Sequence, residues 1–180
     1  GDFMLKKIYQ IGLITGLSFF ISTSFAQQAP SANPMDDIPD AMPFDIPYGM
    51  AISLEKADQM VNAVMAEAKK RNWKMNIAVV DPSGALISFK RMDGAQLASI
   101  AIAEHKARVA ARFRRDTKLL ENAVNVAKLN YVLTLDDVIA SRGGIPLVEG
   151  GKLVGAIGCS GGTGSQDELV CKVGAAMVNK

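Results

Sequence analysis

Two tight-turn signals constrain the fold of this chain more than any other feature. One is the Asp-Pro-Ser-Gly stretch at 81–84, and the other is the Gly-Gly pair at 150–151. They separate short apolar runs at 75–80 and 85–90, and at 145–148 and 152–159. Because so short a reversal joins strands that run in opposite directions, the sequence predicts two β-hairpins.

Helical patterns lie before, between and after these hairpins. Ser53 can cap a helix whose apolar residues recur at three- and four-residue steps until basic residues close it at 69–71. A second long helix is predicted over 98–115, whereas 122–133 has no clean period. Capping-box patterns predict a short helix after Thr134, with Asp137, through Ala140, and a last helix over 166–178, with Ser165 as N-cap and Glu168. This order of elements predicts an α+β domain built around an antiparallel sheet with flanking helices.

The N-terminal part of the chain is organised differently. Residues 1–26 read as a secretory signal peptide, with a short basic start, an apolar stretch and small residues before a cleavage point. Residues 1–3 precede Met4 and are interpreted as additions to the natural start or as a start set too early. The alternative, an uncleaved membrane anchor, has about the length of a spanning helix but is interrupted by Gly, Ser and Thr. We expect cleavage, no stable membrane span afterwards, and a periplasmic or extracellular protein.

Composition and charge limit the remaining chain to one domain and few partner classes. Residues 27–50 hold five of the seven prolines and predict an extended linker or arm, which leaves 51–180 as the domain. Twenty basic and eighteen acidic residues give a net charge of +2, too balanced for a nucleic-acid-binding surface. The hydrophobic fraction of 49% suggests more apolar surface than one sheet covers. We therefore expect subunit contacts on the alanine-rich helix faces: Ala103, Ala107, Ala110 and Ala111.

A glycine-rich loop within 155–167 allows three interpretations. Gly158 to Gly162 fits the G-x-S-x-G pattern of a serine nucleophile, but the single histidine, His105, precedes Ser160 and excludes the α/β-hydrolase order. A triad with Asp81 or Asp93 as orienting acid stays open. No lysine follows the glycines, as a phosphate-binding P-loop requires, although the helix start could attract a small anion. The third interpretation is a sharp turn at Gly161 and Gly162 from strand into helix.

Three stretches taken together resemble a known family. They are Ile77 to Asp81 with Phe89-Lys90-Arg91-Met92-Asp93-Gly94; Ala103 to Ala111; and Gly143-Gly144-Ile145-Pro146 with 155–162 and Asp167. In these the chain is similar to the GlcG/HbpS-like haem-binding family, related to the C-terminal domain of PduO-type proteins. The resemblance implies a profilin-like fold, homo-oligomers with the octamer as one size, and haem as a non-covalent cofactor. It also implies at most a slow haem-degrading or peroxidase-like activity, or a sensory role.

The haem contacts that follow are carried mainly by the helix over 98–115. Iron accepts His, Met, Cys or Tyr ligands, and the flat ring needs an apolar slot with cations for its propionates. His105 is the first candidate for the iron, because it lies between an apolar stripe and an arginine-rich arc. The remaining predicted contacts are Arg108, Arg112, Val109, Phe113, Met92, Gly161 and Gly162, with Met92 as a possible thioether ligand and Tyr131 and Lys106 in reserve. Many relatives have a hydroxyl residue in the position of Val109, so an iron contact made there is in doubt here.

Two other hypotheses and one covalent link stay open. The chain is alternatively an oligomer that binds a different small anion or a partner protein through the loop at 161–162, or an enzyme acting on a small organic acid. No Cys/His spacing indicates zinc, and the C-x-x-C-H motif of covalent haem is absent from the sequence. Export would place Cys159 and Cys171 in an oxidising compartment. Either a disulfide or two buried thiols fits this pair, because one residue of register reverses the direction of the strand side chain.

Overall fold

The computed structural model describes residues 36–179, and its compact unit begins at Ala41. The predicted signal peptide, and the arm as far as residue 35, lie outside the described residues. The rest of the arm reaches the domain: Tyr48 forms an isolated parallel bridge with Leu153, whose N–H donates to Pro47 O at 2.8 Å. Within 36–179, no helix has both the length and the apolar character needed to cross a membrane.

Both predicted hairpins form, and they join into one antiparallel sheet. β1 (Asn76–Val80) pairs with β2 (Leu86–Arg91), and β3 (Gly144–Glu149) pairs with β4 (Lys152–Ser160). The strand order is β2-β1-β4-β3, so the central pair joins the two hairpins. The first turn is closed by Asp81, whose carboxylate accepts the N–H of Ser83 at 2.7 Å and of Ala85 at 3.0 Å. The α+β fold class is confirmed.

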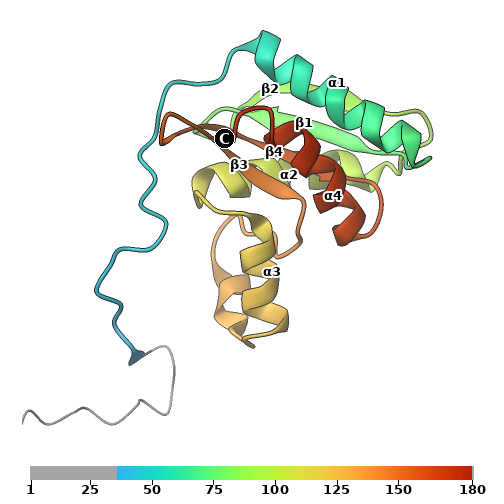
Figure 1. Ribbon diagram of the computed structural model, residues 1–180. Helices are drawn as coiled ribbons and strands as arrows, with labels where there is room; N and C mark the ends of the chain where they lie inside the picture. Colours follow the sequence, from blue (N-terminus) through green and yellow to red (C-terminus); the bar gives the residue numbers. More distant parts are fainter. Residues whose placement is uncertain (1–35, 180) are drawn as a thin grey trace, which may run out of the picture. The chain divides into compact units, whose positions relative to one another are not determined.

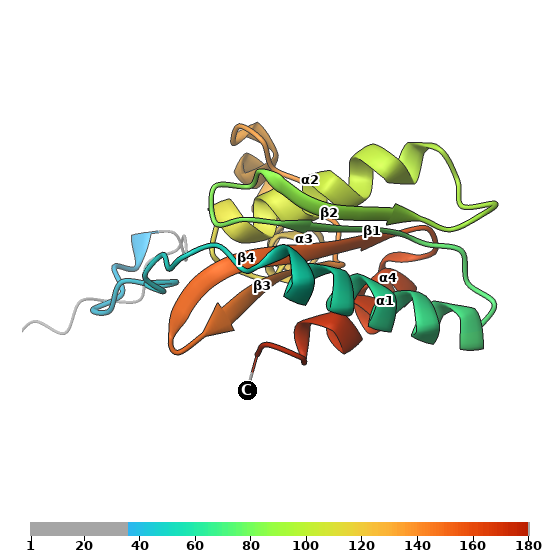
Figure 2. The same cartoon turned by 90° about the horizontal axis from the view of Figure 1, so that it is seen from above.

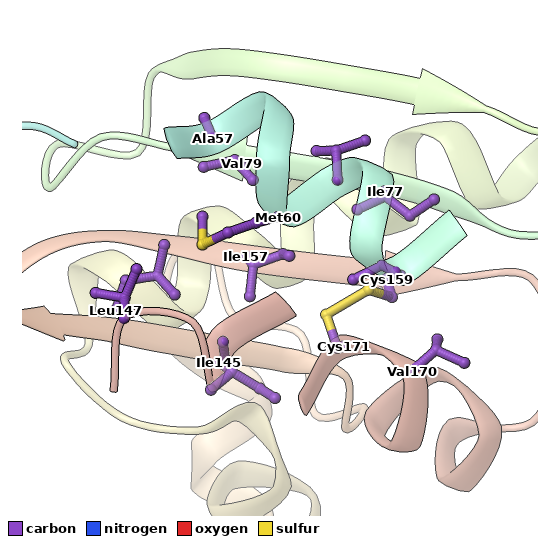
Figure 3. Close-up of a cluster of buried hydrophobic side chains, with 14 of the residues drawn as sticks. Ala57, Met60, Ile77, Val79, Ile145, Leu147, Ile157, Cys159, Val170 and Cys171 are labelled. Atoms are coloured by element: carbon purple, nitrogen blue, oxygen red, sulfur yellow. A yellow bond between two sulfur atoms is a disulfide. The ribbon is translucent and has the colours of Figure 1, made fainter. Parts of the chain in front are cut away.

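Helices cover both faces of the sheet (Figures 1 and 2). α1 (Leu54–Lys70) starts at the predicted cap, where Ser53 Oγ accepts the N–H of Lys56. α1 and α4 (Gly164–Ala175) pack on one face over the larger core cluster, which includes Met60, Ile157 and the Cys159–Cys171 disulfide (Figure 3). The bridge that the sequence left open therefore forms, with the two Cα atoms 5.6 Å apart.

The start of α4 differs from the prediction by two residues. The N-cap is Thr163, which forms a capping box with Gln166, and not Ser165 with Glu168. Both pairs fit the same sequence pattern, so the pattern could not choose between them. Glu168 is instead buried and forms ion pairs with basic side chains from three segments: Lys118, Arg142 and Lys172.

α2 (Ala98–Arg112) covers the opposite face, and its alanines are not a subunit surface. Ala103, Ala107, Ala110 and Ala111 are fully buried against β1 and β4 within the chain. The sequence argument that placed subunit contacts on them was wrong, because these small side chains bring helix and sheet together. A Cβ at Gly158 would lie 2.2 Å from Ala103 O. α2 ends three residues before the predicted Arg115, since Phe113 is its C-cap and Arg114 takes a positive φ of 53°.

Between α2 and β3 the chain forms a small apolar layer that the sequence patterns missed. α3 (Thr117–Asn125) is capped by Asp116, and a short 3-10 helix, η2, spans Asn130–Thr134. The short helix predicted from Thr134 to Ala140 does not form in this described part of the chain. Thr134 Oγ1 donates to Tyr131 O at 2.7 Å, and Asp137 has a left-handed φ of 60°. In place of the predicted helix, the Asp137 carboxylate accepts hydrogen bonds from Arg108 and Arg112 of α2.

Candidate functional site

Asp137 gathers the polar residues predicted on α2. Its carboxylate accepts hydrogen bonds from Arg108 Nε to both oxygens and from Arg112 Nη1 to one, all at 3.0 Å. His105 Nε2 lies 3.1 Å from the Asp137 carbonyl oxygen and 3.2 Å from its carboxylate. The structure therefore brings His105, Arg108 and Arg112 together, but around a carboxylate of the chain itself. The sequence pattern predicts that carboxylate in a helix capping box, so its place here is a correction.

A mostly apolar cavity of about 480 Å³ is lined by none of these four residues, although Phe113 and Leu135 in its wall are near them in the sequence. We call it the Phe113 cavity. It lies between α3, η2, the end of α2 and one residue of the arm, and its lining residues are Phe44, Phe113, Arg115, Leu119, Leu120, Ala123, Leu129, Tyr131, Val132 and Leu135. Val109 is fully buried and packs in the same cluster as Leu120 and Val132, beneath the lining. Phe113 and Tyr131 thus meet in one hollow, with Val109 under its wall.

Two polar side chains interrupt the apolar lining of this cavity. The Arg115 guanidinium lies 3.6 Å from the ring centre of Phe44 and 5.9 Å from that of Phe113, a cation–π arrangement. Burial lowers the pKa of Arg115, but an arginine in a protein keeps its proton at neutral pH. Tyr131 adds a half-exposed phenol on η2. The cavity therefore offers one fixed cation and one oxygen donor within an aromatic and aliphatic surround.

The glycine loop is closed by a side chain of its own helix. Asp167 Oδ1 accepts the N–H groups of Gly161 and Gly162, each at 3.0 Å. Asp167 Oδ2 lies 2.8 Å from Lys106 Nζ, and both residues are almost completely buried. Burial raises the pKa of Asp167, against the opposing effects of Lys106 and of the two N–H groups. The loop amides that could attract an external anion already bind an internal carboxylate.

Ser160 has the surroundings of a structural serine. It is buried, and its Oγ donates to Ser99 Oγ at 3.0 Å. His105 is bonded to Asp137, and Asp81 holds its own turn, so neither is arranged around Ser160. In the part of the chain that the structure describes, no base activates this hydroxyl, and the G-x-S-x-G match is a strand-to-helix turn.

Met92 lies apart from the residues of α2. Its side chain is buried in the core cluster under α1 and α4, whereas α2 covers the other face of the sheet. The Met92 sulfur accepts the N–H of Met75 at 3.4 Å. The structure therefore does not bring Met92 together with His105, and the thioether fills and orders the core.

Comparison with known proteins assigns the chain to a family. The sequence profile described as "Haem degrading protein HbpS-like" matches residues 52–176. The chain belongs to the HbpS-like family. Protein GlcG of Escherichia coli K12 is 40% identical to this HbpS-like chain over 109 residues, which cover 61% of the chain and 81% of GlcG. The family resemblance inferred from the three sequence stretches is confirmed.

Solved structures of related proteins share the fold. The crystal structure of a PduOC:haem complex is 28% identical, with a TM-score of 0.65, and the match covers 72% of this chain and 96% of that chain. A double mutant of Streptomyces reticuli HbpS is 26% identical, with a TM-score of 0.68, and the match covers 80% and 98%. The four-stranded sheet with its helices is therefore the HbpS-like fold.

Sequence reasoning missed the residues that complete the candidate site. Leu129 and Val132 lie in the segment without a clean helical period, and Leu120 lies just before it, so no pattern grouped them with Phe113. Arg115 was placed at the end of a longer helix, and Phe44 was assigned to an extended arm. The one available signal was the density of apolar residues in 119–135, which a short helix and a 3-10 turn bury on one side only.

Proposed function

We propose that this HbpS-like chain binds haem non-covalently in the Phe113 cavity. The observation that carries the proposal is the chemistry of that cavity: an aromatic and aliphatic slot of about 480 Å³ that holds one half-buried guanidinium and one phenol. Small-molecule sites of this kind measure roughly 300–1,000 Å³ and are mostly apolar with a few placed polar groups. Haem requires the same combination of a flat apolar surface, a cation for its carboxylates and an iron ligand. The residues present fit the group.

Four of the lining residues have a specific part in this proposal. Phe44 and Phe113 would hold the ring by its faces and exclude water. Arg115 would bind a propionate, because its guanidinium already lies at the wall and has no carboxylate within ion-pair distance among residues 36–179. Tyr131 is the proposed iron ligand, since its phenol lines the cavity and phenolate is one of the ligands that haem proteins use. Bound haem supplies a redox-active iron, which can support slow ring oxidation, a peroxidase-like reaction or a sensory role.

The sequence predicts His105 as the iron ligand, in place of Tyr131. The two assignments differ in which hydrogen bonds must break when haem binds. Its ring nitrogen is hydrogen-bonded to Asp137, so binding iron would require that bond to break. Arg108 and Arg112 would likewise have to exchange Asp137 for a propionate. The Tyr131 assignment requires neither exchange, and we therefore prefer it.

A hemin titration of the purified protein tests the proposal. We expect a saturable shift of the Soret band at micromolar concentrations. Tyr131→Phe should change the spectrum of the complex, whereas Arg115→Gln should weaken binding roughly tenfold with an unchanged spectrum, as expected for one charged hydrogen bond. Lys152→Gln, an exposed lysine elsewhere, is the matched control. The absence of any Soret shift would sink the proposal, and a spectrum lost in His105→Ala but kept in Tyr131→Phe would assign the iron to His105.

We further propose that the protein is exported and works as a homo-oligomer. Export is supported by the signal-like residues 1–26 and by the disulfide, which persists mainly in oxidising compartments. Oligomer formation is supported by exposed leucines beside the Phe113 cavity: Leu119, Leu133 and Leu135. A second copy that covers them would also close the open side of the cavity.

A further inference from the structure

A second cavity lies on the face of the sheet that α2 does not cover. It measures about 340 Å³ and is bounded by the end of α1, the segment before β1 and the residues that follow β2. We call it the Trp73 cavity, and its lining residues are Met65, Lys69, Asn72, Trp73, Lys74, Arg91, Met92 and Asp93. It shares no residue with the Phe113 cavity.

Charge is the first feature that points to a ligand. Lys69, Lys74 and Arg91 all line the cavity, and none has a carboxylate within ion-pair distance among residues 36–179. The nearby Arg71 differs, because it pairs with Glu67 at 2.8 Å. One carboxylate, Asp93, also lines the cavity, so three cations against one anion leave two positive charges uncompensated. A dianion is the complement of this arrangement.

The apolar part of the cavity is the second feature. Trp73 is half-buried against the core, with the Arg71 guanidinium 5.2 Å from its ring centre. The indole N–H donates no hydrogen bond within the described part of the chain, and the side chains of Met65 and Met92 continue the apolar wall. An indole with methionines beside it presents a flat, polarisable surface that suits an aromatic ring.

We propose that the Trp73 cavity binds a small aromatic dianion. Its ring would lie against Trp73 and the methionines, and its two anionic groups would meet Lys69, Lys74 and Arg91. The proposal is independent of haem binding. The sequence suggested a small-anion site at the loop 161–162. The amides of Gly161 and Gly162 already bind Asp167, so we propose the anion site at the Trp73 cavity instead.

Trp73 is the only tryptophan in the chain, so its fluorescence reports on this cavity. The probe is terephthalate, a benzene ring with two carboxylates, and benzamide is the uncharged aromatic control. We expect terephthalate to change the Trp73 emission saturably at up to millimolar concentrations, with a matching heat of binding by calorimetry. Benzamide should bind far more weakly, because it cannot neutralise the cations.

Three variants locate the binding. Lys74→Gln and Arg91→Gln should each weaken terephthalate roughly tenfold, the loss expected for one charge-assisted hydrogen bond. Lys152→Gln removes an exposed lysine elsewhere and should leave the affinity unchanged. The proposal is overturned by a lack of saturable binding, by equal binding of benzamide, or by equal affinities in Arg91→Gln and the wild type. Circular dichroism of each variant confirms that an affinity change is not a loss of fold.

Discussion

Lys106 shows how the surroundings of a single residue determine its role. The sequence offers it as a reserve iron ligand, yet in the structure it is the largest fully buried side chain. Its ammonium lies 2.8 Å from Asp167 Oδ2 and donates to Cys159 O at 3.4 Å. Because Asp167 also accepts two loop N–H groups, one ion pair connects α2, β4 and the start of α4.

Removing one member of this pair should therefore be costly. Lys106→Met keeps most of the side-chain volume but leaves the carboxylate of Asp167 buried without its cation. We expect a loss of about 3–5 kcal/mol in the free energy of unfolding, measured by urea denaturation. The double variant Lys106→Met with Asp167→Asn should recover part of this loss, and Lys152→Met is the exposed control. A loss below about 1 kcal/mol in the single variant would contradict a structural role for the pair.

At the scale of elements, local patterns predicted the sheet and its long helices but not the layer that forms the candidate site. Turn chemistry at 81–84 and 150–151 identified both hairpins, and apolar periodicity identified α1 and α2. α3 and η2 are short and bury one side only, so their periodicity is weak. Asp137 could not be placed either, because its partners on α2 are 25–32 residues away in the sequence. Contacts of that range leave no local signal.

The disulfide between β4 and α4 leads to two predictions, one on the stability of the fold and one on the export of the chain. The two cysteines are twelve residues apart, and closing such a loop contributes about 3 kcal/mol by the chain-entropy estimate. Cys171→Ala should lower the free energy of unfolding by about that amount, whereas reductant should destabilise the wild type and not the variant.

Intact mass of protein from a periplasmic or culture fraction should show a chain that begins at Gln27 and has no alkylatable thiol. Two thiols alkylated without prior reduction would contradict the disulfide. A chain that still carries residues 1–26 would contradict export.

At the scale of the whole molecule, exposed apolar side chains gather around the Phe113 cavity. The alanines that the sequence offered are buried inside the chain, so they cannot mediate subunit contacts. Leu133 is 59% exposed and Leu135 is 42% exposed, on the η2 side of the cavity. Apolar side chains that gather at the rim of a cavity are more typical of an interface than of free surface. A neighbouring copy would bury them and shield a ligand from water at the same time.

A charge at this surface should separate the subunits without unfolding them. Leu133→Glu places a carboxylate where the neighbouring copy would pack, and burying an unpaired charge is unfavourable enough to prevent association. Leu54→Glu is the matched control, because Leu54 is 58% exposed at the start of α1, where a negative charge is favourable. By size-exclusion chromatography with light scattering at tens of micromolar, the wild type and Leu54→Glu should be oligomers and Leu133→Glu a smaller species. A monomeric wild type would contradict the oligomer, and an unchanged Leu133→Glu oligomer would place the interface on another face.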